Sequence, residues 1–181
     1  MRLVPLLLLL ATTVAHADDE DDAFQPVPKR SVAIAVLGHA THIGDRAEGG
    51  IGPALELGLG RGRWMYFVEG ALASVSVGDA QMPMQLNGRM LHGGIGVRWL
   101  ARQLRDSNKV GGLELFLQSI AGVQRFYFND GTRLLRPELA VGFGMQARAF
   151  RRPRLAVRFD LRALVASGND TGFMGGIGVA W

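Results

Sequence analysis

The stretch Arg154-Leu155-Ala156-Val157-Arg158-Phe159-Asp160-Leu161-Arg162 alternates between large apolar residues and small or charged ones. Successive side chains of a β-strand point to opposite faces, so this stretch predicts a strand with one apolar face and one charged face. An amphipathic helix would instead repeat its apolar residues every three or four positions. The stretch therefore indicates a β-sheet protein.

Seven further segments show the same alternation. Counted at every second residue, their apolar faces run over Val32–Val36, Ile51–Leu59, Trp64–Leu72, Leu91–Trp99, Leu113–Leu117, Leu139–Met145 and Phe173–Trp181. The intervening positions are mainly glycine, alanine and charged residues. In the segment that starts at Trp64 both faces carry apolar residues, which leaves its register open. Together with the first stretch, the pattern predicts eight strands.

Composition excludes several other classes of protein. The chain has 181 residues, of which 48% are hydrophobic and 20% charged, with 25 glycines and no cysteine. It is too apolar to be disordered, and its glycines follow no three-residue period, which excludes a collagen. The formal net charge of +4 is spread over turns and strands rather than gathered in one patch, so we expect no nucleic acid partner.

The N-terminal residues predict export. Met1-Arg2 precedes an apolar run from Leu3 to Ala15, and Ala15-His16-Ala17 places small residues where a signal peptidase cleaves. We therefore expect a signal peptide at residues 1–17. Residues 18–30 begin with five adjacent acids and should form a disordered periplasmic tail, because like charges repel and nothing apolar is available to bury. The folded domain is expected at residues 31–181.

Two barrel architectures fit eight alternating segments. Beyond the signal peptide no uncharged stretch reaches the roughly 18 residues of a spanning helix, whereas each segment is about as long as a tilted spanning strand of roughly 9 to 11 residues. An antiparallel up-and-down transmembrane β-barrel would turn the apolar face outward. A soluble lipocalin-like periplasmic carrier would turn it inward around an apolar ligand.

Three features favour the transmembrane barrel. The charged face is filled in with glycine and alanine, which suits a narrow interior. Aromatic residues lie near segment ends, as in an interfacial girdle: Trp64, Tyr66, Trp99, Phe126, Tyr127, Phe128, Phe150, Phe173 and Trp181. The sequence also ends on a strand pattern with a terminal aromatic residue.

The terminal segment Phe173-Met174-Gly175-Gly176-Ile177-Gly178-Val179-Ala180-Trp181 resembles the last strand of bacterial outer-membrane barrels. With the other seven segments, residues 31–181 resemble the small barrels of the OmpA transmembrane-domain and OmpX type. That resemblance implies a monomer in the outer membrane of a Gram-negative bacterium, with outer-membrane lipids and the barrel-assembly machinery as partners. It implies an assembly signal at Phe173, Ile177, Val179 and Trp181. The family usually ends in phenylalanine, and its periplasmic peptidoglycan-binding domain has no counterpart here.

Charged residues on the inner face predict a filled interior. We expect a lumen network of five acids and four arginines: Glu56, Glu69, Arg98, Glu114, Glu138, Arg148, Arg158, Asp160 and Arg162. Mutual ion pairs are favoured because an unpaired buried charge costs several kcal/mol. The interpretation is a plugged barrel with a structural or membrane-integrity role. The alternatives are a narrow gated pore and the lipocalin-like carrier.

The family orientation would place both chain ends in the periplasm. A basic rim is then expected there, formed by Arg61, Arg63, Arg102, Arg105, Lys109, Arg151 and Arg152 against Asp106 alone. Such a rim could contact anionic headgroups or be solvated. The outer loops would be short, at residues 41–49, 77–85, 125–132 and 167–171, which leaves little room for an adhesin.

Catalysis and cofactors find little support. A lipid A-modifying enzyme would need a serine beside a histidine and an acid, and no such constellation appears around His39, His42 or His92. His39 and His42 are three residues apart and point to opposite faces of a strand, so no metal site is expected. We predict no catalytic residue, no metal and no cofactor.

Overall fold

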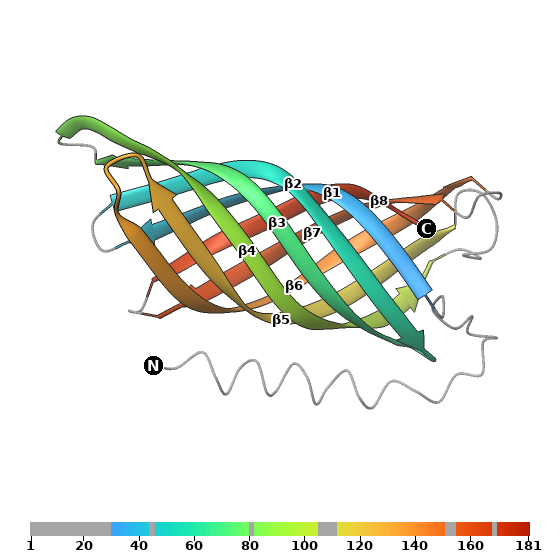
Figure 1. Ribbon diagram of the computed structural model, residues 1–181. Coiled ribbons are helices and arrows are strands. Elements are labelled where there is room, and N and C mark those ends of the chain that lie inside the picture. The colour runs from blue at the N-terminus through green and yellow to red at the C-terminus, as the bar shows by residue number, and fades with distance from the viewer. Residues whose placement is uncertain (1–29, 44–45, 80–81, 105–111, 151–154, 168–169) are drawn as a thin grey trace.

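The barrel wall consists of eight antiparallel strands in chain order (Figure 1). The computed structural model describes residues 30–43, 46–79, 82–104, 112–150, 155–167 and 170–181. The strands are β1 (Arg30–Ile43), β2 (Arg46–Arg61), β3 (Trp64–Asp79), β4 (Met82–Gln103), β5 (Leu113–Phe128), β6 (Arg133–Phe150), β7 (Leu155–Ala166) and β8 (Thr171–Ala180). The predicted eight-stranded antiparallel up-and-down barrel is confirmed. Among the described residues, no helix is long and apolar enough to cross a membrane.

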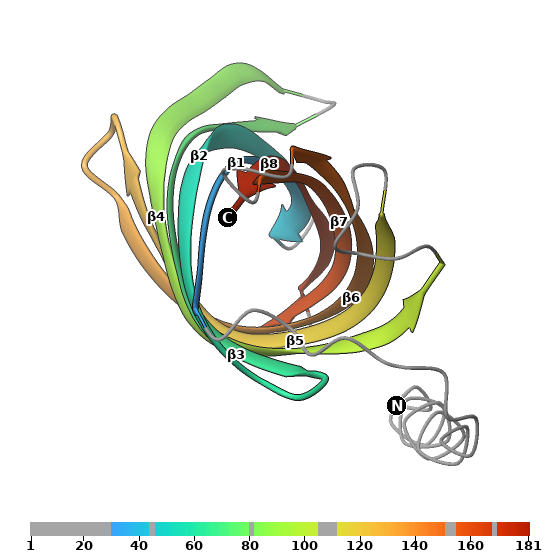
Figure 2. The same ribbon diagram turned by 90° about the vertical axis from the view of Figure 1, so that its right-hand side faces the viewer.

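The first and last strands close the ring (Figure 2). They pair from Ala33↔Ala180 to Thr41↔Gly172. At the seam, the backbone amide of Val32 donates to the carbonyl of Trp181 at 2.9 Å, and the amide of Trp181 donates back at 3.0 Å. Closure leaves no sheet edge, which is the condition for a sheet to lie in lipid. We call this end the terminal rim and the opposite end the distal rim.

Several strands extend farther toward the distal rim than the sequence predicted. The eight strands have 10 to 22 residues each, and the β3–β4 hairpin extends farther from the terminal rim than its neighbours do (Figure 1). β1 and β2 pair up to Ile43↔Arg46, so most of the predicted loop at residues 41–49 is strand. The prediction was wrong because loss of apolar residues from the outer face marks where the apolar surface ends, not where backbone pairing ends.

The tight β5–β6 turn follows its sequence pattern. Gly131 has a φ of 87°, a left-handed conformation that glycine adopts without strain. The amide of Thr132 donates to Asp130 Oδ1 at 2.8 Å, and this hydrogen bond holds the pKa of the Asp130 carboxyl below its usual value.

The two faces of the wall divide as the alternation predicted. In the segment whose register was open, Trp64, Tyr66, Val68 and Leu72 are exposed on the outside, while Met65, Phe67, Glu69 and Ala71 are buried inside. The stretch from Leu155 behaves in the same way: Phe159 and Leu161 are exposed, and Arg158, Asp160 and Arg162 are buried. In both segments the apolar face that the alternation marked therefore lies outside the barrel, opposite to the arrangement that a lipocalin-like carrier requires.

Part of the predicted aromatic girdle is wrong. Phe126 is fully buried inside the barrel, in an apolar cluster with Val75 and Met90, and Phe128 packs against the same cluster. The Phe126 and Phe128 rings stack with centroids 6.0 Å apart. Consecutive aromatic residues cannot share one face of a strand, so the run from Phe126 to Phe128 had to divide between inside and outside.

Glycine makes room for aromatic rings in the bore. A Cβ atom on Gly96 would lie 2.4 Å from the Phe67 ring, and one on Gly144 would lie 2.4 Å from the Phe116 ring. Phe67 joins a buried cluster that crosses the barrel with Leu37, Ile120 and Leu164. The glycines on the inner face therefore permit close packing of the few large side chains that the narrow interior admits.

Several predicted features lie outside the described residues. These are the signal peptide at 1–17, the acidic tail up to residue 29, and Arg105, Asp106, Lys109, Arg151 and Arg152 of the basic rim. Arg30, the last residue of the predicted tail, is already part of β1.

The Gly144 contact can be tested by substitution. Gly144→Ala should lower the free energy of unfolding by about 1–3 kcal/mol, because the new methyl would meet the Phe116 ring and, also at 2.4 Å, the Phe159 carbonyl oxygen. Gly93→Ala is the control, since a Cβ there meets nothing within 4 Å. Urea unfolding of the refolded barrels measures both. Equal midpoints for the two variants would contradict the close packing.

Candidate functional site

The barrel interior holds a chain of ion pairs near the terminal rim. Arg98 of β4 binds Glu56 of β2 through both guanidinium nitrogens, Nη1 to Oε1 at 3.0 Å and Nη2 to Oε2 at 2.8 Å. Arg158 of β7 donates to the same carboxylate at 2.8 Å, and Arg98 also donates to Gln118 Oε1 of β5 at 3.0 Å. All four side chains are buried. One carboxylate thus joins two arginines from different parts of the wall.

The chain continues toward the middle of the barrel. Asp160 forms ion pairs with two arginines: its Oδ1 lies 2.8 Å from Arg162 Nε and its Oδ2 lies 3.6 Å from Arg158 Nε. Arg162 reaches Glu69 of β3 with both terminal nitrogens, at 2.6 and 2.8 Å. β3 and β7 stand four places apart in a ring of eight strands, so this pair joins opposite walls and crosses the bore.

His92 links this chain to a further carboxylate. Its Nε2 lies 3.3 Å from Glu69 Oε1, and its Nδ1 lies 2.7 Å from Glu138 Oε1. The histidine and both carboxylates are buried. The connected series therefore runs from Gln118 on β5 to Glu138 on β6 and includes side chains of β2, β3, β4 and β7.

Arg98 is also held between two aromatic rings. Its guanidinium carbon lies 4.7 Å from the centroid of Phe67 and 4.6 Å from that of Phe116. A cation over an aromatic face is attracted by the ring quadrupole, and more strongly when water is excluded. These are the rings seated against Gly96 and Gly144, so the inner-face glycines, the aromatic rings and the ion pair form one packed unit.

A second ionic cluster lies nearer the distal rim. Glu48 of β2 accepts from Thr41 and Arg136 at 3.1 and 3.2 Å and lies 3.1 Å from His39 Nε2. Arg136 also lies 3.9 Å from a carboxylate oxygen of Asp170. Arg136 comes from β6, which stands opposite β2 in the ring, so this cluster also crosses the bore.

This second cluster was not predicted from the sequence. Glu48 was assigned to an outer loop, His39 was considered only as a catalytic or metal-binding residue and rejected, and Arg136 was not considered. A usable signal existed, because Glu48 continues the inner-face series of Glu56 and Arg136 continues that of Glu138 at every second residue. His92 was considered only as a catalytic residue and was not included in the network.

Two residues of the expected network lie outside the connected series. Glu114 is buried and accepts a hydrogen bond from Nε2 of Gln146. Arg148 borders a small cavity of about 30 Å³ beside Arg98 and Arg158, and its Nε is buried without a hydrogen-bond partner among the described residues. The other seven residues of that list, Glu56, Glu69, Arg98, Glu138, Arg158, Asp160 and Arg162, lie in the series of contacts described above.

The four residues expected to form an assembly signal lie on the outer face of β8 and at its end. Phe173, Ile177 and Trp181 are exposed and Val179 is half-buried. Trp181 lies at the terminal rim, where its backbone pairs with Val32. Among the residues that the structure describes, no group of three or more histidine, aspartate or glutamate side chains is placed to hold a metal.

Breaking one ion pair should reveal the cost of an uncompensated charge. Glu56→Gln leaves Arg98 and Arg158 buried without their shared carboxylate and should reduce the free energy of unfolding by about 3–5 kcal/mol. Glu114→Gln is the matched control, because Glu114 accepts its hydrogen bond from the neutral amide of Gln146. Thermal and urea unfolding of both variants measure the difference. Similar small losses would show that the Glu56 site faces bulk water.

Comparisons with known proteins bear on the fold. No protein-family model and no curated protein sequence matches the chain. Neisserial surface protein A is similar in structure, with a TM-score of 0.64 and 11% identity over 84% of this chain and 96% of that chain. The N-terminal β-barrel domain of Pseudomonas aeruginosa OprF has a TM-score of 0.49 and 16% identity, over 86% of this chain and 98% of that chain. The attachment invasion locus protein Ail of Yersinia pestis has a TM-score of 0.47 and 14% identity, over 84% of this chain and 97% of that chain. The chain thus shares the fold of Neisserial surface protein A, and its eight strands form a closed barrel.

Proposed function

We propose that the protein is an integral outer-membrane barrel with a structural, membrane-integrity role, and that its ion pairs keep the interior closed. The observation that carries this proposal is the inverted distribution of side chains. Large apolar residues cover the outside, among them Ile95 at 66% and Phe143 at 59% exposure, while sixteen polar or charged residues of the part that the structure describes are buried. In water this surface would be costly, whereas in a bilayer it matches the hydrocarbon.

The height of the apolar surface supports membrane insertion. On β3 it runs from Trp64 to Leu72, about 26 Å along the strand at ~3.3 Å per residue. A strand tilt of roughly 35–45° shortens this to about 20 Å, near the apolar band of outer-membrane barrels. Exposed polar residues follow it at the distal side, where Ser74 pairs with Arg89 and Ser76 with Asn87. At the terminal side lie Trp64 and Trp99, whose ring centroids are 6.3 Å apart, and tryptophan is enriched at membrane–water interfaces.

The terminal rim is proposed to face the periplasm. Both described ends of the chain lie there, and Arg61, Arg63 and Arg102 belong to the turns and strand ends of the same rim. Inner-leaflet lipids and the barrel-assembly machinery are the proposed partners, the latter through the β8 residues that end at Trp181. The barrel is proposed to act as a monomer.

Ion pairs across the bore support a structural role over conduction. Two arginine–glutamate contacts, Arg162 with Glu69 and Arg136 with Glu48, join strands on opposite sides of the ring. Apolar clusters fill space between and beside them. A conducting lumen would need these contacts to open, and each broken pair would leave charges that are costly to bury. We accordingly assign no catalytic step and no transported solute.

Fractionation tests the location directly. The protein should be recovered in the outer-membrane fraction, and its electrophoretic mobility should change on boiling, because a closed barrel keeps its structure in detergent until heated. An unfolded control sample, denatured in urea before loading, should migrate like the boiled one. Recovery as soluble periplasmic protein, with no change on boiling, would refute membrane insertion.

Planar bilayer recordings test whether the interior is closed. The wild-type barrel should give no stable conductance steps, whereas Glu69→Ala/Arg162→Ala, which removes one acid and one base from the bore, should give open steps. Ser76→Ala/Asn87→Ala is the control, since it removes a hydrogen-bonded pair from the outer wall of β3 and β4. Steps of equal size in all three proteins would show that the network does not close the lumen and would favour the narrow pore.

A further inference from the structure

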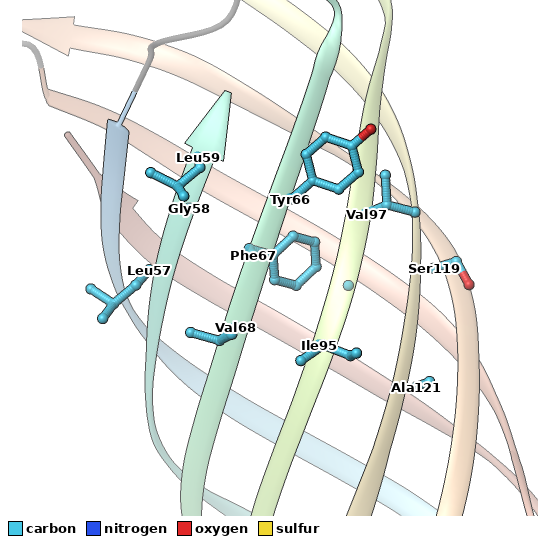
Figure 3. Close-up of a pocket in the computed structure, with 11 residues that line it drawn as sticks. Leu57, Gly58, Leu59, Tyr66, Phe67, Val68, Ile95, Val97, Ser119 and Ala121 are labelled. Atoms are coloured by element: carbon cyan, nitrogen blue, oxygen red, sulfur yellow. The ribbon is translucent and has the colours of Figure 1, made fainter. Parts of the chain in front are cut away.

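The outer wall contains an apolar groove across four neighbouring strands (Figure 3). Its volume is about 640 Å³, within the range of roughly 300–1,000 Å³ of small-molecule sites. It is lined on one side by Leu57 and Leu59 of β2, Tyr66 of β3 and Val97 of β4. On the other side it is lined by Ser119 and Ala121 of β5. A membrane barrel needs an apolar wall, but it does not need a hollow in that wall.

The hollow has a local cause in the sequence. Along the outer face of β5, Leu117 and Val123 are large, but the two outward positions between them are Ser119 and Ala121. On β4, Ile95 and Val97 alternate with Gly94 and Gly96, which add no side chain behind the wall. Phe67 of β3 is also among the lining residues, and its ring is seated against Gly96. Small residues on β5 beside larger ones on β2 to β4 thus leave the groove on the outer surface.

The terminal end of the groove is basic and aromatic. Strand pairing places Arg61 opposite Trp64, and Trp64 opposite Trp99, one step beyond Leu59, Tyr66 and Val97 on the same outer face. Arg102 follows on β4, opposite Leu115. Arg61 and Arg102 are exposed, and the ring centroids of the two tryptophans lie 6.3 Å apart. The groove therefore leads from apolar side chains, past indole rings, to guanidinium groups.

We propose that this groove is a binding site for one anionic diacyl phospholipid of the inner leaflet, with an acyl chain in the groove and the phosphate at Arg61 and Arg102. The order of the side chains matches the order of groups in such a lipid. Indole rings favour the headgroup level, and guanidinium groups donate paired hydrogen bonds to phosphate oxygens. The inference rests on the proposed function, because it needs the terminal rim to face the periplasmic leaflet.

Native mass spectrometry tests the site. The barrel is released from bilayers of equal parts phosphatidylglycerol and phosphatidylethanolamine, and retained lipid is counted for each variant. The wild type should retain one phosphatidylglycerol per barrel. Ala121→Leu, which fills the groove, should retain at least about five-fold less. Ala163→Leu, the same change at an exposed outward position of β7 across the barrel, should retain as much as the wild type.

A second pair of variants separates headgroup from chain recognition. Arg61→Gln/Arg102→Gln should abolish the preference for phosphatidylglycerol over phosphatidylethanolamine, while Arg125→Gln/Arg133→Gln at the distal side should preserve it. Equal retention by Ala121→Leu and Ala163→Leu, or a groove occupied by a second copy of the chain, would overturn the lipid site. All variants are first checked for the change in mobility on boiling. A protein that lacks it contradicts membrane insertion itself, whereas one that shows it and retains no lipid contradicts only the site.

Discussion

The narrow bore of an eight-stranded barrel is the constraint on which the rest of the structure depends. A ring of this size encloses just enough space for side chains to fill. Each large inward residue must therefore be matched by a small one nearby, as Phe67 is by Gly96 and Phe116 by Gly144. Charged residues placed in the same space must find partners within it, because little water remains to solvate them.

Closure of the ring and pairing of the charges support each other. Backbone pairing of β1 with β8 fixes the diameter, and the diameter brings arginines of β6 and β7 within reach of glutamates of β2 and β3. Those contacts in turn connect walls that share no backbone hydrogen bonds. A barrel held only by neighbouring strands could deform into an oval, and ion pairs across the bore oppose that deformation.

Most of the fold could be predicted from the sequence, and the site only in part. A two-residue period reports which face a residue occupies, so Arg158, Asp160 and Arg162 could be assigned to one face without a structure. The period does not report how far pairing continues past the apolar surface, which is why Glu48 was assigned to a loop. Nor does it identify partners, because Arg162 meets Glu69 from a strand four places away, a relation that depends on the closed ring.

The positions of the register shifts bear on how this chain can tolerate changes in length. Pairing slips between Val77 and Asp79, between Leu100 and Arg102, and between Arg148 and Phe150, all toward the rims. Between the rims each pair of strands keeps one register, so a single inserted residue would exchange the lipid-facing and inward-facing sets along the remainder of a strand. Insertions and deletions in a lineage of such barrels should therefore gather at the rims, while the central wall changes by substitution alone.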